Sequence, residues 1–325
     1  MTTGFADVRE TEPAPGRSLP LVVEPAYAGF DLVKWAADNR PALHRRLARH
    51  GGILFRGFTA GSVEVFHHFI TAASGEPLPY LERSSPRREV EGNVYTSTEH
   101  PANEAIFLHN EQSYNLTWPL RIFFHCTVAP AAGGATPVAD CRRVYQRISA
   151  RTRDRFAERG YRYVRNFGTG FGLGWREAFQ TDDRATVERY CEANGIEHRW
   201  LGGERLSTAQ VRAAVHQHPE SGETTWFNHV TFFHVSTLDP VLSRAMLSLG
   251  RDRLPNNTYY GDGTEIEPEV LDELRAAYRA ETVVFPWREG DILMLDNMLT
   301  AHGREPFTPP RRILVGMAQP VRTTP

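Results

Sequence analysis

The sequence has few of the features that mark secreted, membrane-embedded or nucleic-acid-binding proteins. Its 325 residues include only three cysteines, which form no CxxC pair and cannot all pair within one chain. It contains no run of about 18 apolar residues, the length that a membrane-spanning helix requires, and its first residues lack the apolar stretch of a signal peptide. The formal net charge of -2 provides no basic excess for nucleic acid or anionic lipid. We therefore expect a soluble cytoplasmic protein with neither a nucleic acid nor a membrane as a partner.

The composition is that of a globular protein, with 41% hydrophobic and 23% charged residues. No internal repeat, low-complexity tract or Pro/Gly/Ser linker divides the chain. Residues 1–18 are polar and rich in Pro and Thr, which predicts a flexible N-terminal arm. We expect residues 19–325 to form a single domain.

Short apolar runs separated by loops dominate the pattern and predict an antiparallel, mainly β core of the α+β class. Expected strands include residues 53–55, 105–128, 282–285, 292–295 and 312–318. Helical spacing of apolar residues predicts helices after Asp31 and after Ser62, over residues 140–159 and over residues 208–215. Residues 76–104 resemble a long loop, and loops of that length are often lids over a site.

The segment His109-Asn110-Glu111 is a candidate for half of a metal site. On a strand, residues two apart project from the same face, so the imidazole and the carboxylate could reach one ion. Iron(II) sites of the facial-triad type need two imidazoles and one carboxylate, which leaves three positions open. The best candidate for the second imidazole is His302, which follows a predicted strand and the polar pair Asp296-Asn297. That pair could orient the His302 loop.

A pair of arginines, Arg311 and Arg312, opens the last predicted strand. Either guanidinium could hold the far carboxylate of a dicarboxylic acid through two charge-assisted hydrogen bonds. Neighbours on a strand face opposite sides, so only one of the two should point inward. The pattern alone does not choose between them.

A second histidine cluster, His216 and His218 with Glu220 or Glu223, is an alternative metal site and would indicate a zinc hydrolase. It follows an expected helix and lies in a polar loop, which makes it the weaker candidate.

Six segments, spread over most of the chain, resemble the taurine dioxygenase and clavaminate synthase-like family, in the branch that contains the syringomycin-pathway hydroxylase. They are GGILFRGF (51–58), LHNEQSY (108–114), PAAGGATPVAD (130–140), NNTYYGDG (256–263), FPWREGDILMLDNMLTAHGREPF (285–307) and RRILVGM (311–317). The resemblance implies a double-stranded β-helix, or jelly roll, with flanking helices. It also implies iron(II) on His109, Glu111 and His302.

The resemblance further implies 2-oxoglutarate, bound by Thr136 and one of Arg311 and Arg312, and O2 as the second cosubstrate. Oxidative decarboxylation to succinate and CO2 would then drive attack on an unactivated C–H bond, giving hydroxylation, desaturation or cyclisation. Glu111 stands where Asp is commoner, but a carboxylate of either length argues against a halogenase. A catalytically silent sensing protein on the same fold remains an alternative, against which the intact ligand set argues.

Family analogy suggests a small-molecule substrate, an amino acid or a derivative of one, free or on a carrier protein, in specialised metabolism. Candidate substrate-binding residues are Ser113, Asn228 and His229, which follow the metal motif or lie in an aromatic run. The mixed charges of residues 82–104, including Arg87, Arg88 and Glu99, suit a lid that closes over a zwitterion.

Overall fold

The computed structural model describes residues 7–13, 18–59, 61–80, 82–85, 87–98 and 100–323. Its main element is an eight-stranded sheet in the order β1-β2-β3-β17-β7-β20-β5-β4. The strands are β1 (Val8–Thr11), β2 (Leu21–Pro25), β3 (Gly52–Phe55), β4 (Glu89–Glu91), β5 (Val94–Thr96), β7 (Thr117–Val128), β17 (Ile292–Asp296) and β20 (Arg312–Arg322). All pairs are antiparallel except β2 with β3.

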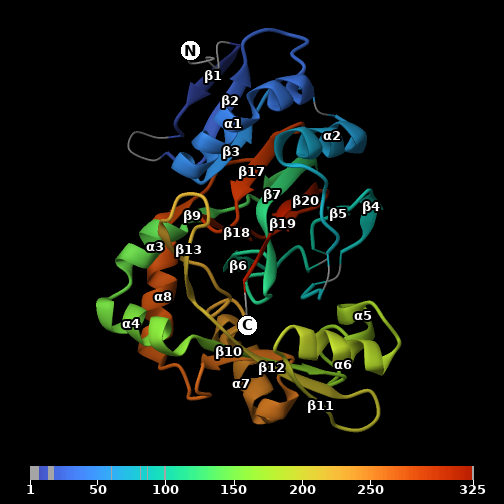
Figure 1. Ribbon diagram of the computed structural model, residues 1–325, viewed down its shortest axis with the longest axis vertical. Helices are drawn as coiled ribbons and strands as arrows, with labels where there is room; N and C mark the ends of the chain where they lie inside the picture. Colours follow the sequence, from blue (N-terminus) through green and yellow to red (C-terminus); the bar gives the residue numbers. More distant parts are fainter. Residues whose placement is uncertain are drawn as a thin grey trace.

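The central strands of this sheet are apolar on both faces. On β7, Phe123 packs against the cluster beneath the N-terminal helices, while Ile122 and Phe124 face the opposite cluster. Met294 and Leu295 of β17 divide in the same way. The outer face is covered by α1 (Leu32–His50) and α2 (Val63–Ser74), which lie against the sheet in Figure 1. The opposite face of the sheet, which carries Ile122, Phe124 and Leu295, is not covered by these two helices and is called the inner face below.

A four-stranded sheet in the order β16-β9-β18-β6 faces the central strands. It consists of β6 (Ile106–His109), β9 (Val138–Asp140), β16 (Thr282–Val283) and β18 (Thr300–Arg304). Together the two sheets form the double-stranded β-helix that the sequence predicted. The chain enters β18 directly from β17 through a tight turn, so one connection links the two sheets at the candidate metal ligands.

The rest of the chain packs around this core. Figure 1 shows α3, α4 and α8 along one side and α5, α6 and α7 at the end opposite α1. These helices are α3 (Cys141–Arg147), α4 (Ala150–Arg159), α5 (Trp175–Phe179), α6 (Arg184–Ala193), α7 (Pro240–Ser248) and α8 (Pro268–Glu281), with the 3-10 turns η1 (Val235–Thr237) and η2 (Arg251–Arg253). The remaining strands are β8 (Ala132–Gly133), β10 (Tyr161–Phe167), β11 (Glu197–Trp200), β12 (Leu206–Arg212), β13 (Val215–Gln217), β14 (Thr224–Trp226), β15 (Asn256–Tyr260) and β19 (Phe307–Thr308).

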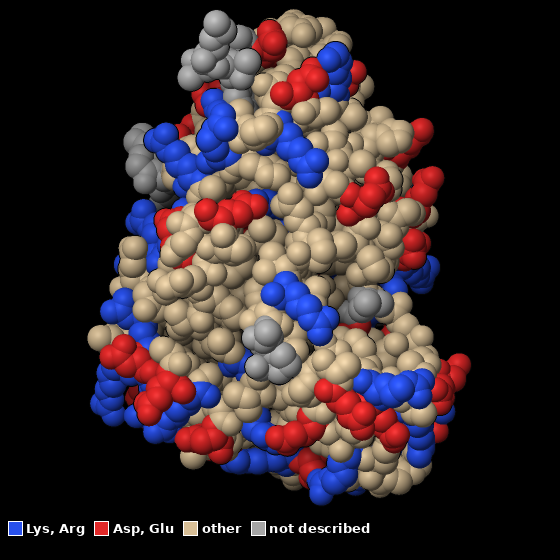
Figure 2. Space-filling view, in the orientation of Figure 1, with Lys and Arg blue, Asp and Glu red and all other residues tan. Residues whose placement is uncertain are grey.

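Several local predictions are confirmed. Asp31 and Ser62 cap α1 and α2 by accepting backbone hydrogen bonds. Gly51 ends α1 in the left-handed conformation at φ 76°. Figure 2 shows acidic and basic side chains interspersed over the face in view, in keeping with the small net charge. None of the helices in the described residues is long and apolar enough to cross a bilayer.

Four local predictions are wrong in part. The helix expected over 140–159 is two helices, because Ser149 begins a new one by accepting from the backbone of Thr152. The helix expected over 208–215 is mostly strand β12, which pairs on both sides with β10 and β11. Residues 76–104 contain the hairpin β4–β5, and Glu99 lies outside the described residues. The expected N-terminal arm contains β1, which pairs with β2, while residues 1–6 and 14–17 lie outside the description.

Candidate metal centre and active site

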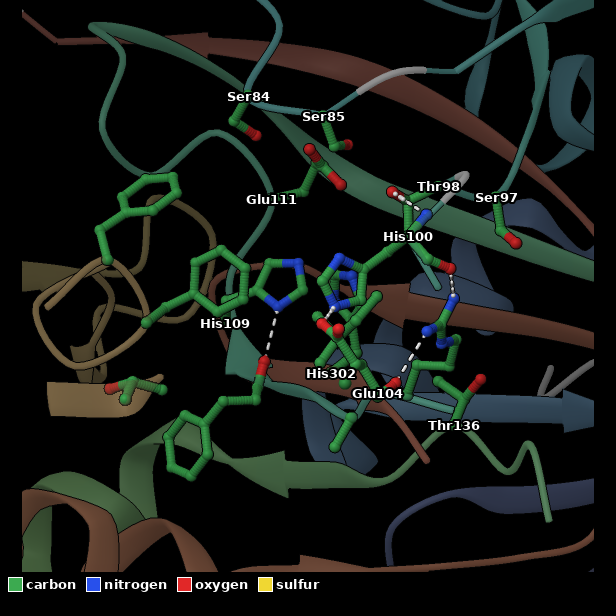
Figure 3. A pocket seen from close by; sticks show the side chains of 18 of the residues that line it. Ser84, Ser85, Ser97, Thr98, His100, Glu104, His109, Glu111, Thr136 and His302 are labelled. Carbon is green, nitrogen blue, oxygen red and sulfur yellow. Dashed lines mark hydrogen bonds and ion pairs between the residues drawn. The ribbon is translucent and has the colours of Figure 1, made fainter. Parts of the chain in front are cut away.

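The two candidate histidine ligands face each other across a strand pair. In the register of β6 and β18, His109 lies opposite His302, and their ring centroids are 4.5 Å apart. Glu111 follows β6 in a turn and completes the group (Figure 3). One ligand atom from each of the three side chains lies within 4.8 Å of the others. The structure therefore brings together the three residues predicted from the sequence.

Glu111 reaches this position by a route that differs from the predicted one. Strand β6 ends at His109, and Gln112 has a positive φ of 54°, so the chain turns sharply instead of continuing as a strand. The side chain of Asn297 holds this turn. Its Oδ1 accepts from the Glu111 backbone N–H, and its Nδ2 donates to the Glu111 carbonyl, both at 2.8 Å. The expected orienting role of Asp296-Asn297 thus falls largely on Glu111 and not on His302 alone.

Both imidazoles have a ring nitrogen available for a metal, and burial lowers the pKa of both. His109 Nδ1 donates to the Phe107 carbonyl at 2.9 Å, which leaves Nε2 with a lone pair. His302 is buried, and its Nδ1 has no hydrogen-bond partner in the described structure. Burial lowers the pKa of both rings. Burial therefore favours the neutral form of both rings, the form in which imidazole ligates a metal.

The Glu111 carboxylate has a partner that sequence reasoning missed. Arg87 donates from Nη2 to Glu111 Oε2 at 2.7 Å, and the two side chains are only 8% and 3% exposed. Arg87 comes from the polar segment 82–104, where it was predicted only as one charge of a lid. Burial is the largest influence on Arg87 and lowers its pKa, but the charge and hydrogen bond of Glu111 together with the nearby Tyr80 and Tyr114 hydroxyls raise the pKa above its ordinary value. The two residues are 24 positions apart, and no helix or strand periodicity in the sequence indicates contact over that separation.

Arg311 and Thr136 lie together on the other side of the histidines. Arg311 donates from Nε to the Gly134 carbonyl at 2.9 Å, and its Nη2 lies 3.5 Å from Thr136 Oγ1. Thr136 also accepts from the Trp287 indole at 3.1 Å, a contact that the sequence did not indicate. Burial lowers the pKa of Arg311 to about 10, still high enough for a cation at neutral pH. Arg312 is exposed and lies outside the cavity lining, so of the two candidate arginines it is Arg311 that borders the cavity.

A cavity of about 590 Å³ connects these groups. That is a volume typical of small-molecule sites. Apolar side chains from the inner face of the main sheet and from the segment 232–242 form one part of its wall: Phe124, Ile313, Val315, Phe232, Phe233, Leu238 and Leu242. Hydroxyl and charged groups from the segment 82–104 form another part: Ser84, Ser85, Arg87, Ser97, Thr98, His100 and Glu104. Figure 3 shows Ser84 and Ser85 beyond Glu111, so part of the predicted lid does border the metal centre.

The three candidate substrate residues are not part of the cavity lining. Ser113 and His229 hydrogen-bond each other at 2.5 Å, and both are buried. Asn228 uses its amide for the Ala214 carbonyl and the Val230 N–H. The turn after Glu111 breaks the strand alternation on which the Ser113 prediction depended. These residues form a second layer, in which His229 packs 5.6 Å from the His109 ring.

The alternative metal site at His216 and His218 is not supported. His218 donates from Nε2 to Asp296 at 2.9 Å, and its Nδ1 accepts from the Ser221 N–H at 3.1 Å. His216 Nε2 bonds the Ala213 carbonyl at 3.2 Å. Both nitrogens of His218 and one of His216 are therefore committed, and among the described residues the only grouped ligand set is that of His109.

Comparison of the sequence with known protein families identifies the family of this chain. Residues 10–318 fit the family described as "Taurine catabolism dioxygenase TauD, TfdA family". The chain belongs to this family. As a TauD/TfdA dioxygenase, the protein depends on iron(II), 2-oxoglutarate and O2, as the sequence predicted.

Two relatives and one solved structure illustrate the match. The TauD/TfdA-family chain is 41% identical over 276 residues to the dapdiamide synthesis protein DdaC of Enterobacter agglomerans. The match covers 85% of this chain and 84% of that protein. It is 28% identical over 318 residues to a clavaminate synthase-like protein of Arabidopsis thaliana, with coverage of 94% and 90%. The PvcB protein of Pseudomonas aeruginosa shares the fold, with a TM-score of 0.59 at 18% identity and coverage of 98% and 95%.

Proposed function

We propose that this dioxygenase holds iron(II) on His109, Glu111 and His302 and oxidises an unactivated C–H bond of a small molecule. The observation that carries the proposal is the grouping of these three ligand atoms within 4.8 Å of one another, on side chains that all border the same cavity. Two neutral imidazoles and one carboxylate are the donor set of facial-triad iron enzymes. When bound, the iron would activate O2 for attack on a C–H bond, a reaction that protein side chains alone do not support.

The chain's own residues bind and orient the cosubstrate. We propose that the Arg311 guanidinium and the Thr136 hydroxyl hold the far carboxylate of 2-oxoglutarate, because they lie together on the cavity wall. A guanidinium fork matches a carboxylate with two charge-assisted hydrogen bonds. Trp287 fixes the Thr136 hydroxyl, and the Gly134 carbonyl fixes Arg311. The phenyl and aliphatic wall keeps water from the reacting centre.

The substrate is proposed to be an amino acid or a derivative of one, free or tethered to a carrier protein, and the reaction its hydroxylation. A role in dapdiamide synthesis is given for the relative DdaC, which supports a substrate from specialised metabolism. The cavity is also large enough for a molecule of that class beside 2-oxoglutarate. The three buried, unpaired cysteines support the expected cytoplasmic setting.

Substrate-dependent succinate release tests the proposal. Purified protein with iron(II), 2-oxoglutarate and O2 would be screened against amino acids and acyl amino acids, with succinate and oxidised product measured together. We expect one compound class to give succinate and a product 16 mass units heavier in roughly equal amounts, since each turnover uses one O2. Turnover that continues without iron or without 2-oxoglutarate would contradict the proposed function.

A further inference from the structure

Arg87 occupies an unusual place for a charged side chain. Its guanidinium is stacked over the Tyr80 ring at 4.8 Å and contacts Glu111 through Nη2. Its Nε and Nη1 are buried and have no hydrogen-bond partner in the described structure. The residue also borders the cavity that contains the metal ligands.

This arrangement is a poor way to stabilise the fold. Removing a guanidinium from water is costly, and two nitrogens without hydrogen-bond partners add to the cost. The contact with Glu111 is its one carboxylate pairing in the described residues. Buried polar groups left unsatisfied in this way commonly mark functional positions.

The pairing divides the Glu111 carboxylate into two unequal oxygens. Oε2 accepts from Arg87 at 2.7 Å, so Oε1 is the oxygen without this charged donor. A glutamate side chain is long enough to chelate one ion with both oxygens, as it does in calcium sites. Two-oxygen chelation would fill a coordination position that a facial-triad site must leave open.

We infer that Arg87 is a positioning residue that keeps Glu111 a one-oxygen metal ligand and so preserves an open coordination position. The inference rests on the proposed function, because it requires that Glu111 bind the metal. Arg87 achieves this by occupying Oε2, while stacking on Tyr80 prevents the guanidinium from moving away. As a cation beside the metal, Arg87 also repels it, so its presence does not serve metal affinity itself.

Loss of Arg87 should change metal affinity and 2-oxoglutarate affinity in opposite directions, or leave metal affinity unchanged. In Arg87→Met, the repulsion is gone and Oε2 is free to chelate. The variant should therefore bind Mn(II), used as a probe for iron(II), as tightly as the wild type or up to roughly tenfold more tightly. Addition of 2-oxoglutarate to the anaerobic iron complex should become at least about tenfold weaker, because a coordination position is blocked and a nearby cation is lost.

The experiment compares three full-length variants with the wild type. Mn(II) affinity is measured by electron paramagnetic resonance, 2-oxoglutarate binding by the visible charge-transfer absorption of the anaerobic iron complex, and folding by urea denaturation without metal. Arg88→Met is the matched control, because Arg88 is the exposed neighbour and does not border the cavity. Arg87→Lys keeps the positive charge and the ability to donate a hydrogen bond to Glu111, and should restore much of the 2-oxoglutarate binding that Arg87→Met loses.

Retained Mn(II) affinity, weakened 2-oxoglutarate binding, an undiminished free energy of unfolding and rescue by lysine together support the inference. Wild-type 2-oxoglutarate binding in Arg87→Met overturns it, as does a parallel loss of Mn(II) affinity and of folding stability, which would indicate a structural role. Failure of the proposed function is a different result. It would appear as undiminished Mn(II) binding in His302→Ala, whatever Arg87 does.

Discussion

The side-chain amide of Asn297 is hydrogen-bonded to both ends of the Glu111 residue, accepting from its N–H and donating to its carbonyl at 2.8 Å each. Asn297 lies in the turn between β17 and β18, and β18 carries His302. One turn therefore sets the position of the carboxylate ligand and leads into the strand of the distal histidine. Two ligands far apart in the sequence are placed by a single short connection.

Replacing Asn297 by Ala should weaken the metal site. The change leaves the buried Glu111 N–H and carbonyl without partners, at a cost of about 1 to 3 kcal/mol of folding stability. Loss of a group that orients a ligand should weaken Mn(II) binding by roughly ten- to a hundredfold. Calorimetric titration with Mn(II) measures the effect, and Asn39→Ala on α1, which also removes one amide-to-carbonyl bond, is the control. Wild-type affinity in Asn297→Ala would show that the turn holds Glu111 without it.

Arg311 and Arg312 should behave unequally when each is replaced by Ala. Arg311 borders the cavity beside Thr136, whereas Arg312 is exposed. Removing the buried partner of a carboxylate costs about 3 to 5 kcal/mol, so the 2-oxoglutarate constant should rise more than about a hundredfold in Arg311→Ala. Arg312→Ala should leave it within about twofold. Similar mild effects in both, measured by anaerobic titration, would place the 2-oxoglutarate clamp elsewhere.

Leu242 and Leu247 provide a matched test of the substrate wall. Both are exposed leucines on α7, at 45% and 44%, but only Leu242 borders the cavity. Leu242→Ala should raise the KM for the substrate by roughly tenfold, because up to about 1.5 kcal/mol of apolar contact is lost. Leu247→Ala should not change it. Neither variant should alter Mn(II) or 2-oxoglutarate binding, and an equal change of KM in both would remove α7 from the substrate site.

Asp296 should make the fold sensitive to acid. Burial alone would raise the pKa of this carboxyl, but the Arg121 charge and the hydrogen bond from His218 outweigh it, and the pKa lies below its ordinary value of 3.8. A lowered pKa in the folded state stabilises the protein above the unfolded-state pKa, and this contribution is lost as the pH falls through the folded-state value. The free energy of unfolding should therefore decrease below about pH 4.

Urea denaturation at about pH 7 and about pH 3.5 measures this loss. Asp296→Asn should be less stable than the wild type at neutral pH and should lose less on acidification. Asp154→Asn, which changes an exposed acid on α4, should follow the wild type at both values. An acid-induced loss of the same size in Asp296→Asn and the wild type would show that other groups control the acid limit.

The ligand set could be predicted from the sequence because its signals are local. His109 and Glu111 are two residues apart, and His302 follows an apolar strand. Helix starts at Asp31 and Ser62 were equally visible, since a cap contacts only its own first turn. These features depend on a few neighbouring residues.

What the sequence did not reveal depends on contacts between distant segments. The Arg87–Glu111 pair exists because the segment 82–104 crosses the metal centre, and the Asn297 contact joins residues 186 positions apart. Residues 208–212 form a strand because β10 pairs with all of them and β11 pairs with residues 208 and 209, which overrides their local preference. The turn at Gln112 likewise redirected Ser113 away from the cavity.

The most direct test of the account is anaerobic titration of His302→Ala with iron(II) and 2-oxoglutarate, followed by the visible charge-transfer absorption. The wild type should bind one iron and develop the absorption, and His216→Ala should do the same, because His216 contacts the Ala213 carbonyl outside the cavity. His302→Ala should develop no absorption, because two remaining ligands hold iron weakly. A full charge-transfer signal in His302→Ala would contradict the assignment of His109, Glu111 and His302 as the metal centre.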